Sequence, residues 1–467
     1  MKSALSVLED AGDTLLKLAG SKGIDEAEAY LVSNKVLTIR LVNNAVFESK
    51  GVHDIGVGLR VIKGKMLGFS STADLSKKSL EKLVSTAVET AKARQLPFKY
   101  SFPKRGKIAK VEGIYDKKLA DLPPEKAVEL AYEMVASSLA CNKKIVDNAG
   151  VLNLVSYESL VLNSHGVKAE NNGTFFEGSL SATAKDGKNV SEGSDATAGR
   201  SLKELKPENI GENAAEMAVS GLKAQKLKEG TYNVILDYEP TSGIVSNIAM
   251  LVSPMIARLY MQLFLDKLGK KIASSQVNVI DDPLMPHGVN SAPIDEEGNP
   301  TKRQIIIDKG VLKNFVYDSF YAALEKKKTT GSAQRASFST GVSVFPGKNY
   351  NGEPIPVPLN PYLKPGDWKR EEILKDTKAG LLVRRFHYTR VTNPTRGDFT
   401  SVLRMGLFMV KNGEVVGAVA KSRLLDNLID MLRNVDAVSN KLVVAGNWGN
   451  YTHVPVIRTK AHVAPID

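Results

Sequence analysis

Residues 231–268 read TYNVILDYEP TSGIVSNIAM LVSPMIARLY MQLFLDKL and contain the least polar helix that the sequence predicts. Val234 to Leu236 are typical of a short buried strand, and residues 237–240 of a turn. The apolar run that starts at about Ser242 indicates a helix. Because this helix is strongly apolar, we expect it at the heart of a folded domain.

The same run is the only candidate membrane span, from Ile244 to Leu265. It contains side chains that hydrocarbon disfavours, namely Asn247, Pro254, Arg258 and Gln262. We therefore expect a core helix in a soluble, cytoplasmic protein. Acidic side chains also interrupt residues 1–19, which leaves no apolar segment typical of a secretory signal there.

Length and composition indicate an ordered protein of two or three domains, with 467 residues of which 43% are hydrophobic and 24% charged. We predict an α+β fold. An N-terminal α+β domain is expected over residues 1–226, with a possible sub-boundary near residues 97–122. A C-terminal, largely antiparallel β domain with the central apolar helix is expected over residues 227–467.

Local patterns predict the elements of the first domain. Residues 25–32 and 36–41 are typical of two successive strands, and Lys63-Gly64 of a hairpin turn, because glycine readily takes a positive φ. Two further strands are expected on either side of Asn171-Asn172-Gly173. Residues 207–222 predict a helix.

The second domain carries acidic and proline-rich segments. Residues 346–368 contain six prolines and predict a long extended loop. The carboxylates of Asp281-Asp282 and of Asp295 to Glu297 could hold a cation or act as paired acids. Both groups lie in predicted turns, where acidic residues are common because they bind backbone N–H groups, and we favour that simpler role.

Several segments resemble, in order, those of the TldD/PmbA peptidase family, and the resemblance spans essentially the whole chain. They are the strand, turn and helix of residues 231–265, Leu268 to Ile272, Asp295 to Thr301, Gly310 to Lys313, Thr329 to Arg335, Asn393 to Thr400, and Asn412 to Glu414. The resemblance implies a peptidase fold. It also makes Arg335 and Asp398, in two of these segments, candidates for peptide or interface contacts.

In that family the TldD-type subunit carries His-Glu-x-x-x-His on the apolar helix, and this motif falls here on residues 246–251. Ser246, Asn247 and Leu251 occupy the positions of the two histidines and the glutamate. A hydroxyl, an amide and an isobutyl group cannot replace imidazole ligands and a carboxylate base. The chain therefore resembles the PmbA (TldE) type of subunit, without catalytic or metal-binding residues of its own.

The resemblance also places a cysteine metal ligand of the TldD-type subunit near residues 446–453, where this chain has no cysteine. None of the six histidines has a partner at metal-binding helical spacing. His453 with His462, or His287 with His387, could still meet in space as an alternative metal site. The single cysteine, Cys141, is expected to be a buried apolar residue rather than a ligand.

The formal net charge of +12 raises the question of a nucleic-acid partner. Lysines are scattered among glutamates, and the short lysine runs lack the interleaved aromatic residues that stack on bases. A solvated basic surface is the simpler interpretation.

The resemblance implies a non-catalytic or regulatory subunit of a metallopeptidase that acts on unfolded peptides. A TldD-type partner would then supply the metal, expected to be zinc. One alternative is a homodimeric, chaperone-like peptide-binding protein, and a lesser one is a basic nucleic-acid-binding protein. A hydrolase with an unrelated site is a further possibility.

Overall fold

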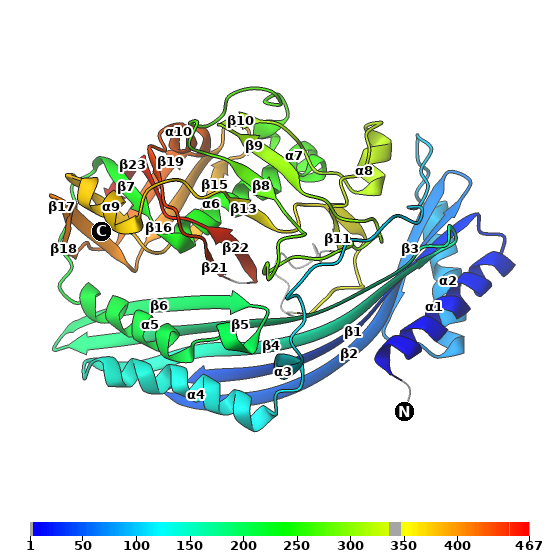
Figure 1. Ribbon diagram of the computed structural model, residues 1–467, viewed down its shortest axis with the longest axis horizontal. Coiled ribbons are helices and arrows are strands. Elements are labelled where there is room, and N and C mark those ends of the chain that lie inside the picture. The colour runs from blue at the N-terminus through cyan, green and yellow to red at the C-terminus, as the bar shows by residue number, and fades with distance from the viewer. Residues whose placement is uncertain (1–2, 336–346, 448, 467) are drawn as a thin grey trace.

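A computed structural model describes residues 3–335, 347–447 and 449–466 of the chain. A long six-stranded antiparallel sheet forms the first half, with strand order β3-β2-β1-β4-β5-β6. It curves beneath the second half in Figure 1. Its strands are β1 (Glu26–Val42), β2 (Ala45–Lys63), β3 (Met66–Thr72), β4 (Ile145–Asn163), β5 (Lys168–Asp186) and β6 (Asn189–Gly199).

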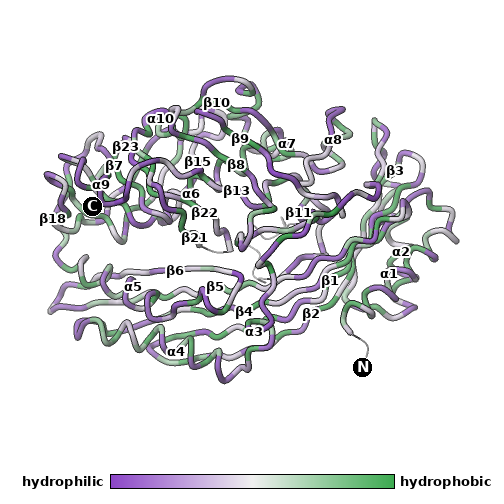
Figure 2. The backbone as a smooth tube through the Cα atoms, in the orientation of Figure 1, coloured by the Kyte–Doolittle hydropathy of each residue, from purple (hydrophilic) through white to green (hydrophobic). Residues whose placement is uncertain are grey.

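Helices cover the outer face of this sheet at both ends (Figure 1). At one end α1 (Ala4–Ser21) and α2 (Lys77–Lys92) bury leucines, valines and alanines against β1 and β2. At the other end α4 (Pro124–Cys141) and α5 (Pro207–Gly221) cover β4 and β5, with the short α3 (Lys117–Ala120) and η1 (Leu202–Glu204) nearby. Apolar and polar positions intermingle along these strands in Figure 2, as half-buried strands require.

The opposite face packs against the second half of the chain. Tyr30 and Val32 of β1 lie in one apolar cluster with Ile294 and Tyr350. Both faces of β1 are therefore covered, and its residues 27–34 are all buried. This burial explains why residues 26–42 form one strand instead of the two that were predicted, because the polar Ser33 and Asn34 lie inside.

The turn predicted at Asn171-Asn172-Gly173 is wrong. These residues lie within β5 and pair with residues 157–159 of β4. The chain reverses instead at residues 164–167, where Gly166 has φ of 76°. The turn predicted at Lys63-Gly64 is confirmed, with Gly64 at φ of 61°.

Cys141 is exposed, contrary to the prediction. The buried side of α4 runs through Ala131, Met134 and Ser138, and Cys141 is the last residue of the helix. Its thiol lies beyond the part of α4 that packs on the sheet.

The second half contains a mixed sheet in the order β15-β16-β19-β23-β7-β14-β17-β18, in which β20 also pairs with β23. All pairs are antiparallel except β7 with β14. The strands are β7 (Gly230–Leu236), β14 (Ala379–Val383), β15 (His387–Asn393), β16 (Asp398–Leu403), β17 (Leu407–Lys411), β18 (Glu414–Ala418), β19 (Ser422–Asn427), β20 (Ala437–Val438) and β23 (Ile457–Pro465). The predicted α+β class with antiparallel sheets is confirmed.

A second, smaller sheet has the order β10-β9-β8-β13-β22-β21, and β11 pairs separately with β12. Their bounds are β8 (Val279–Asp281), β9 (Gln304–Asp308), β10 (Val311–Leu312), β11 (Ala333–Arg335), β12 (Pro354–Pro356), β13 (Pro361–Leu363), β21 (Val443–Asn447) and β22 (Asn450–Val454). β12 and β13 lie in the segment predicted as an extended loop. Residue 346 of that segment lies outside the described residues. The remaining helices of the described chain are α6 (Tyr238–Leu251), α7 (Pro254–Leu259), η2 (Gln262–Phe264), α8 (Ser319–Leu324), α9 (Arg370–Asp376) and α10 (Leu428–Arg433).

The central helix α6 is shorter than predicted, because it ends at Leu251 rather than near Leu265. Pro254 has no N–H and disfavours helical geometry in the residue before it. Ser253 accordingly adopts an extended conformation and caps α7 by accepting a hydrogen bond from Ile256 N. Within the described residues, no helix is long and apolar enough to span a membrane.

Candidate functional site

The residues of α6 that align with the family's metal motif are held by the packing of the helix. Asp237 caps α6 and accepts a hydrogen bond from Arg370 Nη2 at 2.7 Å. Leu251 is fully buried in the core of the second half. Ser246 is half-buried, and Asn247 Nδ2 donates to the carbonyl of Gly243 at 2.8 Å. The Asn247 amide therefore makes a bond within its own helix.

The hairpin of β21 and β22 packs directly on α6. Thr452 Oγ1 donates to Ser242 Oγ at 3.0 Å, and both side chains are buried. The structure thus brings together the two segments to which the resemblance assigns histidine and cysteine ligands in TldD-type subunits. Residue 448, which lies between β21 and β22 in the sequence, is outside the described residues.

The described side chains at the motif positions of α6 and on this hairpin do not fit a metal ion. Ser246, Asn247 and Leu251 offer no imidazole or carboxylate. His453 Nε2 already accepts a hydrogen bond from Val289 N at 3.1 Å, and burial lowers the pKa of this histidine. Across the described ranges, no three His, Cys, Asp or Glu side chains are grouped as ligands for a metal.

Both histidines of the His453–His462 pair, considered as an alternative metal site, have other contacts. His462 Nε2 lies 3.1 Å from Glu229 Oε1, whereas His453 contacts the backbone of Val289. His387 begins the edge strand β15, where burial lowers its pKa.

A group of buried and partly buried charged side chains lies where the two halves of the chain meet. We call it the buried charge network, and its members are Glu28, Arg60, Asp295, Glu296, Glu297, Asp318, Arg335 and Lys348. Arg60 Nη2 lies 2.6 Å from Glu28 Oε2 and 2.8 Å from Glu297 Oε1. Arg335 Nη2 lies 2.6 Å from Glu28 Oε1. Glu28 therefore receives two guanidinium groups, one from each half.

Glu296 extends the network to Lys348. Its Oε1 atom lies 2.9 Å from Lys348 Nζ, and its Oε2 atom accepts a hydrogen bond from the backbone N–H of Arg335. Asp295 accepts hydrogen bonds from the backbone N–H groups of Glu297 and Ala333. The acidic turn thus binds backbone groups as predicted, but it also joins a buried ionic network that the sequence did not indicate.

Three cations in this network face five carboxylates. Burial and the neighbouring Glu297 raise the pKa of Asp295 to about 8. The same two causes raise the pKa of Asp318 well above its usual range. The raised pKa values favour the protonated forms of Asp295 and Asp318, which reduces the excess of negative charge in the network.

The two candidate contact residues, Arg335 and Asp398, differ in burial and in the contacts that they make. The Arg335 side chain is fully buried and stacks over the ring of Tyr30 at 4.7 Å, so the interface that it makes is internal to the chain. Asp398 is partly exposed, accepts a hydrogen bond from Asn427 Nδ2 at 2.9 Å and pairs with Arg396. A peptide contact by Asp398 stays a prediction.

The Asp281-Asp282 pair does not form a shared acid site. Burial raises the pKa of Asp281 to about 7, and its carboxylate accepts hydrogen bonds from the N–H groups of Leu359 and Asn360. Asp282 accepts from Leu284 N and lies 3.6 Å from Arg303 Nε. The two carboxylates bind different segments.

One signal could have located the network from the sequence. Glu28 and Arg60 interrupt apolar stretches of their strands, and they face each other directly in the register of β1 and β2. Opposite charges at paired, inward positions indicate a buried ion pair once the register is known. The contributions of Glu297 and Arg335 need the tertiary structure.

The chain is similar to known proteins over most of its length. Three PmbA/TldA metallopeptidase sequence models cover the chain: domain 1 at residues 27–91, the central domain at residues 117–222 and the C-terminal domain at residues 229–464. The metalloprotease PmbA homolog of Haemophilus influenzae is 26% identical over 460 residues, which span 95% of this chain and 93% of that protein. The metalloprotease TldD homolog of Buchnera aphidicola from Acyrthosiphon pisum is 24% identical over 447 residues, or 92% of this chain and 88% of that protein.

The crystal structure of TldE from Thermococcus kodakarensis has the same fold. Its TM-score is 0.87 at 23% sequence identity, and the match covers 97% of this chain and all of that one. With the C-terminal domain model alone matching half of the sequence, the chain belongs to the PmbA/TldA metallopeptidase family.

Proposed function

We propose that this chain is the subunit without metal ligands in a cytoplasmic TldD/TldE-like peptidase that acts on unfolded peptides. The observation that carries the proposal is the side-chain set at residues 246, 247 and 251. These positions hold a hydroxyl, an amide that donates a hydrogen bond to the backbone of its own helix, and a core leucine. The helix is otherwise intact. At these three positions the helix therefore retains its packing without offering metal ligands or a base.

In this proposal a TldD-type partner supplies the metal, expected to be zinc, together with the general base and the cysteine ligand. The bound metal would polarise the peptide carbonyl and activate water. This chain completes the chamber and orients the substrate.

The edge strand β15 is the element best suited to orient an extended peptide. It is the outer strand of its sheet, and residues 388–392 are exposed. The preceding Phe386 N–H donates to Glu239 Oε2 of α6 at 2.8 Å, so the edge is tied to the helix. An unfolded peptide could add to this edge through backbone hydrogen bonds, which favours sequence-tolerant binding.

The test is a peptidase assay on an unfolded peptide with this chain alone, a TldD-type subunit alone, and both together. We expect cleavage with the mixture, loss of cleavage on adding a chelator, and none with this chain alone. The Ser246→His/Asn247→Glu/Leu251→His variant alone should also stay inactive, because no thiolate lies nearby. Chelator-sensitive cleavage by the unmodified chain alone would refute the proposal.

The molecular mass of this chain in solution, together with its binding to peptide and nucleic acid, distinguishes the alternative functions. A homodimeric, chaperone-like peptide-binding protein would form a dimer of this chain, bind unfolded peptide and gain no activity from a TldD-type subunit. A nucleic-acid-binding protein would retain DNA or RNA with a steep salt dependence.

A further inference from the structure

An apolar surface is exposed beyond the C-terminal end of α6. Four large apolar side chains within ten residues are exposed: Leu259 at 63%, Tyr260 at 61%, Leu265 at 42% and Leu268 at 52%. We call these four residues the α7 patch. Four large exposed apolar side chains in one ten-residue segment are a candidate interaction surface.

The patch is held in place by its neighbours. Leu263 and Phe264 are buried in the core between the exposed positions. Arg258 Nη2 lies 2.8 Å from Glu325 Oε1, which fastens α7 to the end of α8. At the other end, Gly269 N donates to the carbonyl of Leu312 at 2.8 Å. The apolar side chains are therefore presented outward from an anchored backbone.

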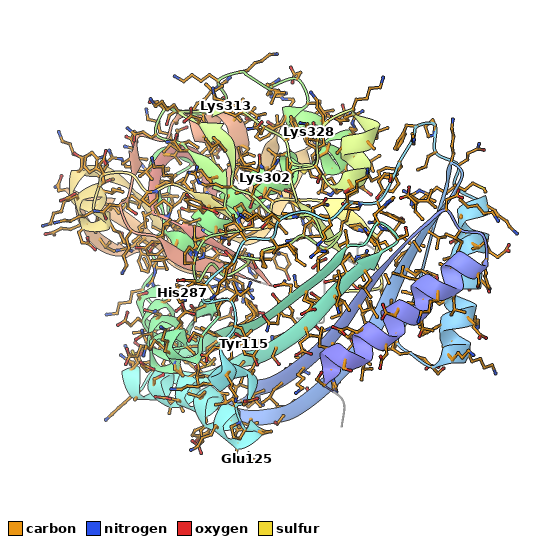
Figure 3. All side chains as sticks on the ribbon, turned by 45° about the vertical axis from the view of Figure 1, so that its right-hand side comes forward. Tyr115, Glu125, His287, Lys302, Lys313 and Lys328 are labelled. Atoms are coloured by element: carbon orange, nitrogen blue, oxygen red, sulfur yellow. The ribbon has the colours of Figure 1, made fainter. Side chains whose placement is uncertain are left out.

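The rim of the patch is basic. The carboxylate of Asp266 is already paired with Lys267 at 2.6 Å, and that of Glu325 with Arg258. Lys270 and Lys271 follow the patch directly, and Lys326 to Lys328 follow α8. Figure 3 shows Lys313 and Lys328 on the same upper side of the second half. This rim favours an occupant that carries carboxylates.

These charges argue against a second copy of this chain. A symmetric dimer would bring the same patch of both copies together and place lysines against lysines. An anionic membrane would also suit apolar and basic groups. However, α7 has only six residues, and the exposed side chains project from several short elements. They do not form one face of a long amphipathic helix, which is the usual element that binds a membrane surface.

We infer that the α7 patch is the surface on which the TldD-type partner docks, through an apolar area rimmed by carboxylates on that partner. The inference rests on the proposed function and adds the place of contact. Because α7 follows α6 after only Val252 and Ser253, a partner seated here lies against the end of the helix that carries the family's motif positions.

The test uses matched tyrosine variants of the full chain. Tyr260→Asp lies in the patch, whereas Tyr132→Asp lies on α4, on the far side of the molecule in Figure 1, and Tyr132 is similarly exposed at 53%. Binding to the TldD-type subunit of the same organism is measured by surface plasmon resonance, and circular dichroism checks folding. We expect Tyr260→Asp and Leu268→Asp each to weaken binding at least about tenfold and Tyr132→Asp to leave it unchanged.

A charge variant tests the rim. Lys270→Glu/Lys271→Glu should slow association at low salt, and the difference from the unmodified chain should shrink as salt is raised, because screening weakens steering. An unchanged rate at low salt would contradict the role given to the basic rim.

The outcomes separate this inference from the proposed function. If the complex forms and cleaves peptide but the patch variants bind as tightly as Tyr132→Asp, the inference is overturned and the proposed function stands. If the unmodified chain forms no complex, both fall. The patch variants could instead bind the TldD-type subunit normally but lose binding to phosphatidylcholine–phosphatidylserine vesicles. That result would identify a membrane-binding surface and overturn the inference.

Discussion

Arg335 and Glu28 join the two halves of the chain, with Arg335 Nη2 donating to Glu28 Oε1 at 2.6 Å although 307 positions separate them in the sequence. Both side chains are fully buried. Glu28 also accepts two hydrogen bonds from Arg60. The first sheet is therefore fastened to β11 of the second half by a buried ion pair whose partners are further bonded.

Removal of one partner should be strongly destabilising. Arg335→Met leaves Glu28 short of a cation in the interior, and we expect it to lower the free energy of unfolding by about 3 to 5 kcal/mol. Denaturant titration measures the change. The control is Arg40→Met on the same strand as Glu28, because Arg40 pairs with Glu48 at the surface. Arg40→Met should lower the free energy of unfolding by only about 0 to 1 kcal/mol. Equal losses would show that burial of the Arg335 pair has no energetic consequence.

The raised pKa values in the network predict a loss of stability as pH rises. Folded Asp295 holds its proton up to a pKa of about 8, whereas the unfolded carboxyl releases it near 4. Between these values the folded state binds the extra proton, so its stability falls with pH by up to about 1.4 kcal/mol per pH unit for each such group. The contribution is complete below pH 4 and lost above pH 8.

Asp318→Asn tests this pH dependence without removing the cap of α8. Its Oδ1 atom accepts a hydrogen bond from Tyr321 N, which an amide oxygen can also accept. We expect the variant to match the unmodified protein near pH 4 and to lose less stability as the pH rises toward 9, as measured by denaturation across that range. Asp13→Asn, on the exposed side of α1, should leave the slope unchanged. A steeper slope in Asp318→Asn would contradict a protonated Asp318.

Substitution of Leu251 tests how much the packing of α6 contributes to the stability of the protein. Its side chain is fully buried in the core around α6, so Leu251→Ala should leave a cavity and cost about 2 to 5 kcal/mol. Leu259→Ala, on the exposed face of α7, should cost less than about 0.5 kcal/mol. Thermal unfolding of both variants measures the difference. A cost for Leu251→Ala as small as that of Leu259→Ala would mean that residue 251 is not in the core.

Local chemistry made part of this fold predictable. Lys63-Gly64 ends β2 where expected, and α5 runs over Pro207–Gly221 as its proline start and apolar spacing indicate. The end of α6 was also encoded locally, in Pro254, but the continuing apolar run concealed it. Apolar character alone cannot separate one long core helix from two short elements buried in the same core.

The rest depends on contacts between distant residues. Asn171 to Gly173 are typical of a turn, yet pairing with β4 keeps them in a strand. Glu296 lies in a turn-forming sequence, and only the approach of Arg335 and Lys348 makes it part of a buried network. The alignment of α6 with the family's motif was visible in the sequence, whereas the packing of the β21–β22 hairpin on it required the structure.

Gly331 offers a final test of how the acidic turn is seated. It lies in the segment that resembles the family's Thr-Gly-x-x-x-Arg stretch, has φ of 69°, and a Cβ atom here would lie 2.5 Å from the carbonyl oxygen of Pro300. Gly187 has φ of 59° with open space around its Cβ position. Gly187→Ala should therefore cost about 1 to 2 kcal/mol from backbone strain alone, and Gly331→Ala should cost more, because residue 300 must also move. Denaturant titration of the two variants isolates the steric part, and equal costs would show that the segments at residues 300 and 331 can separate freely.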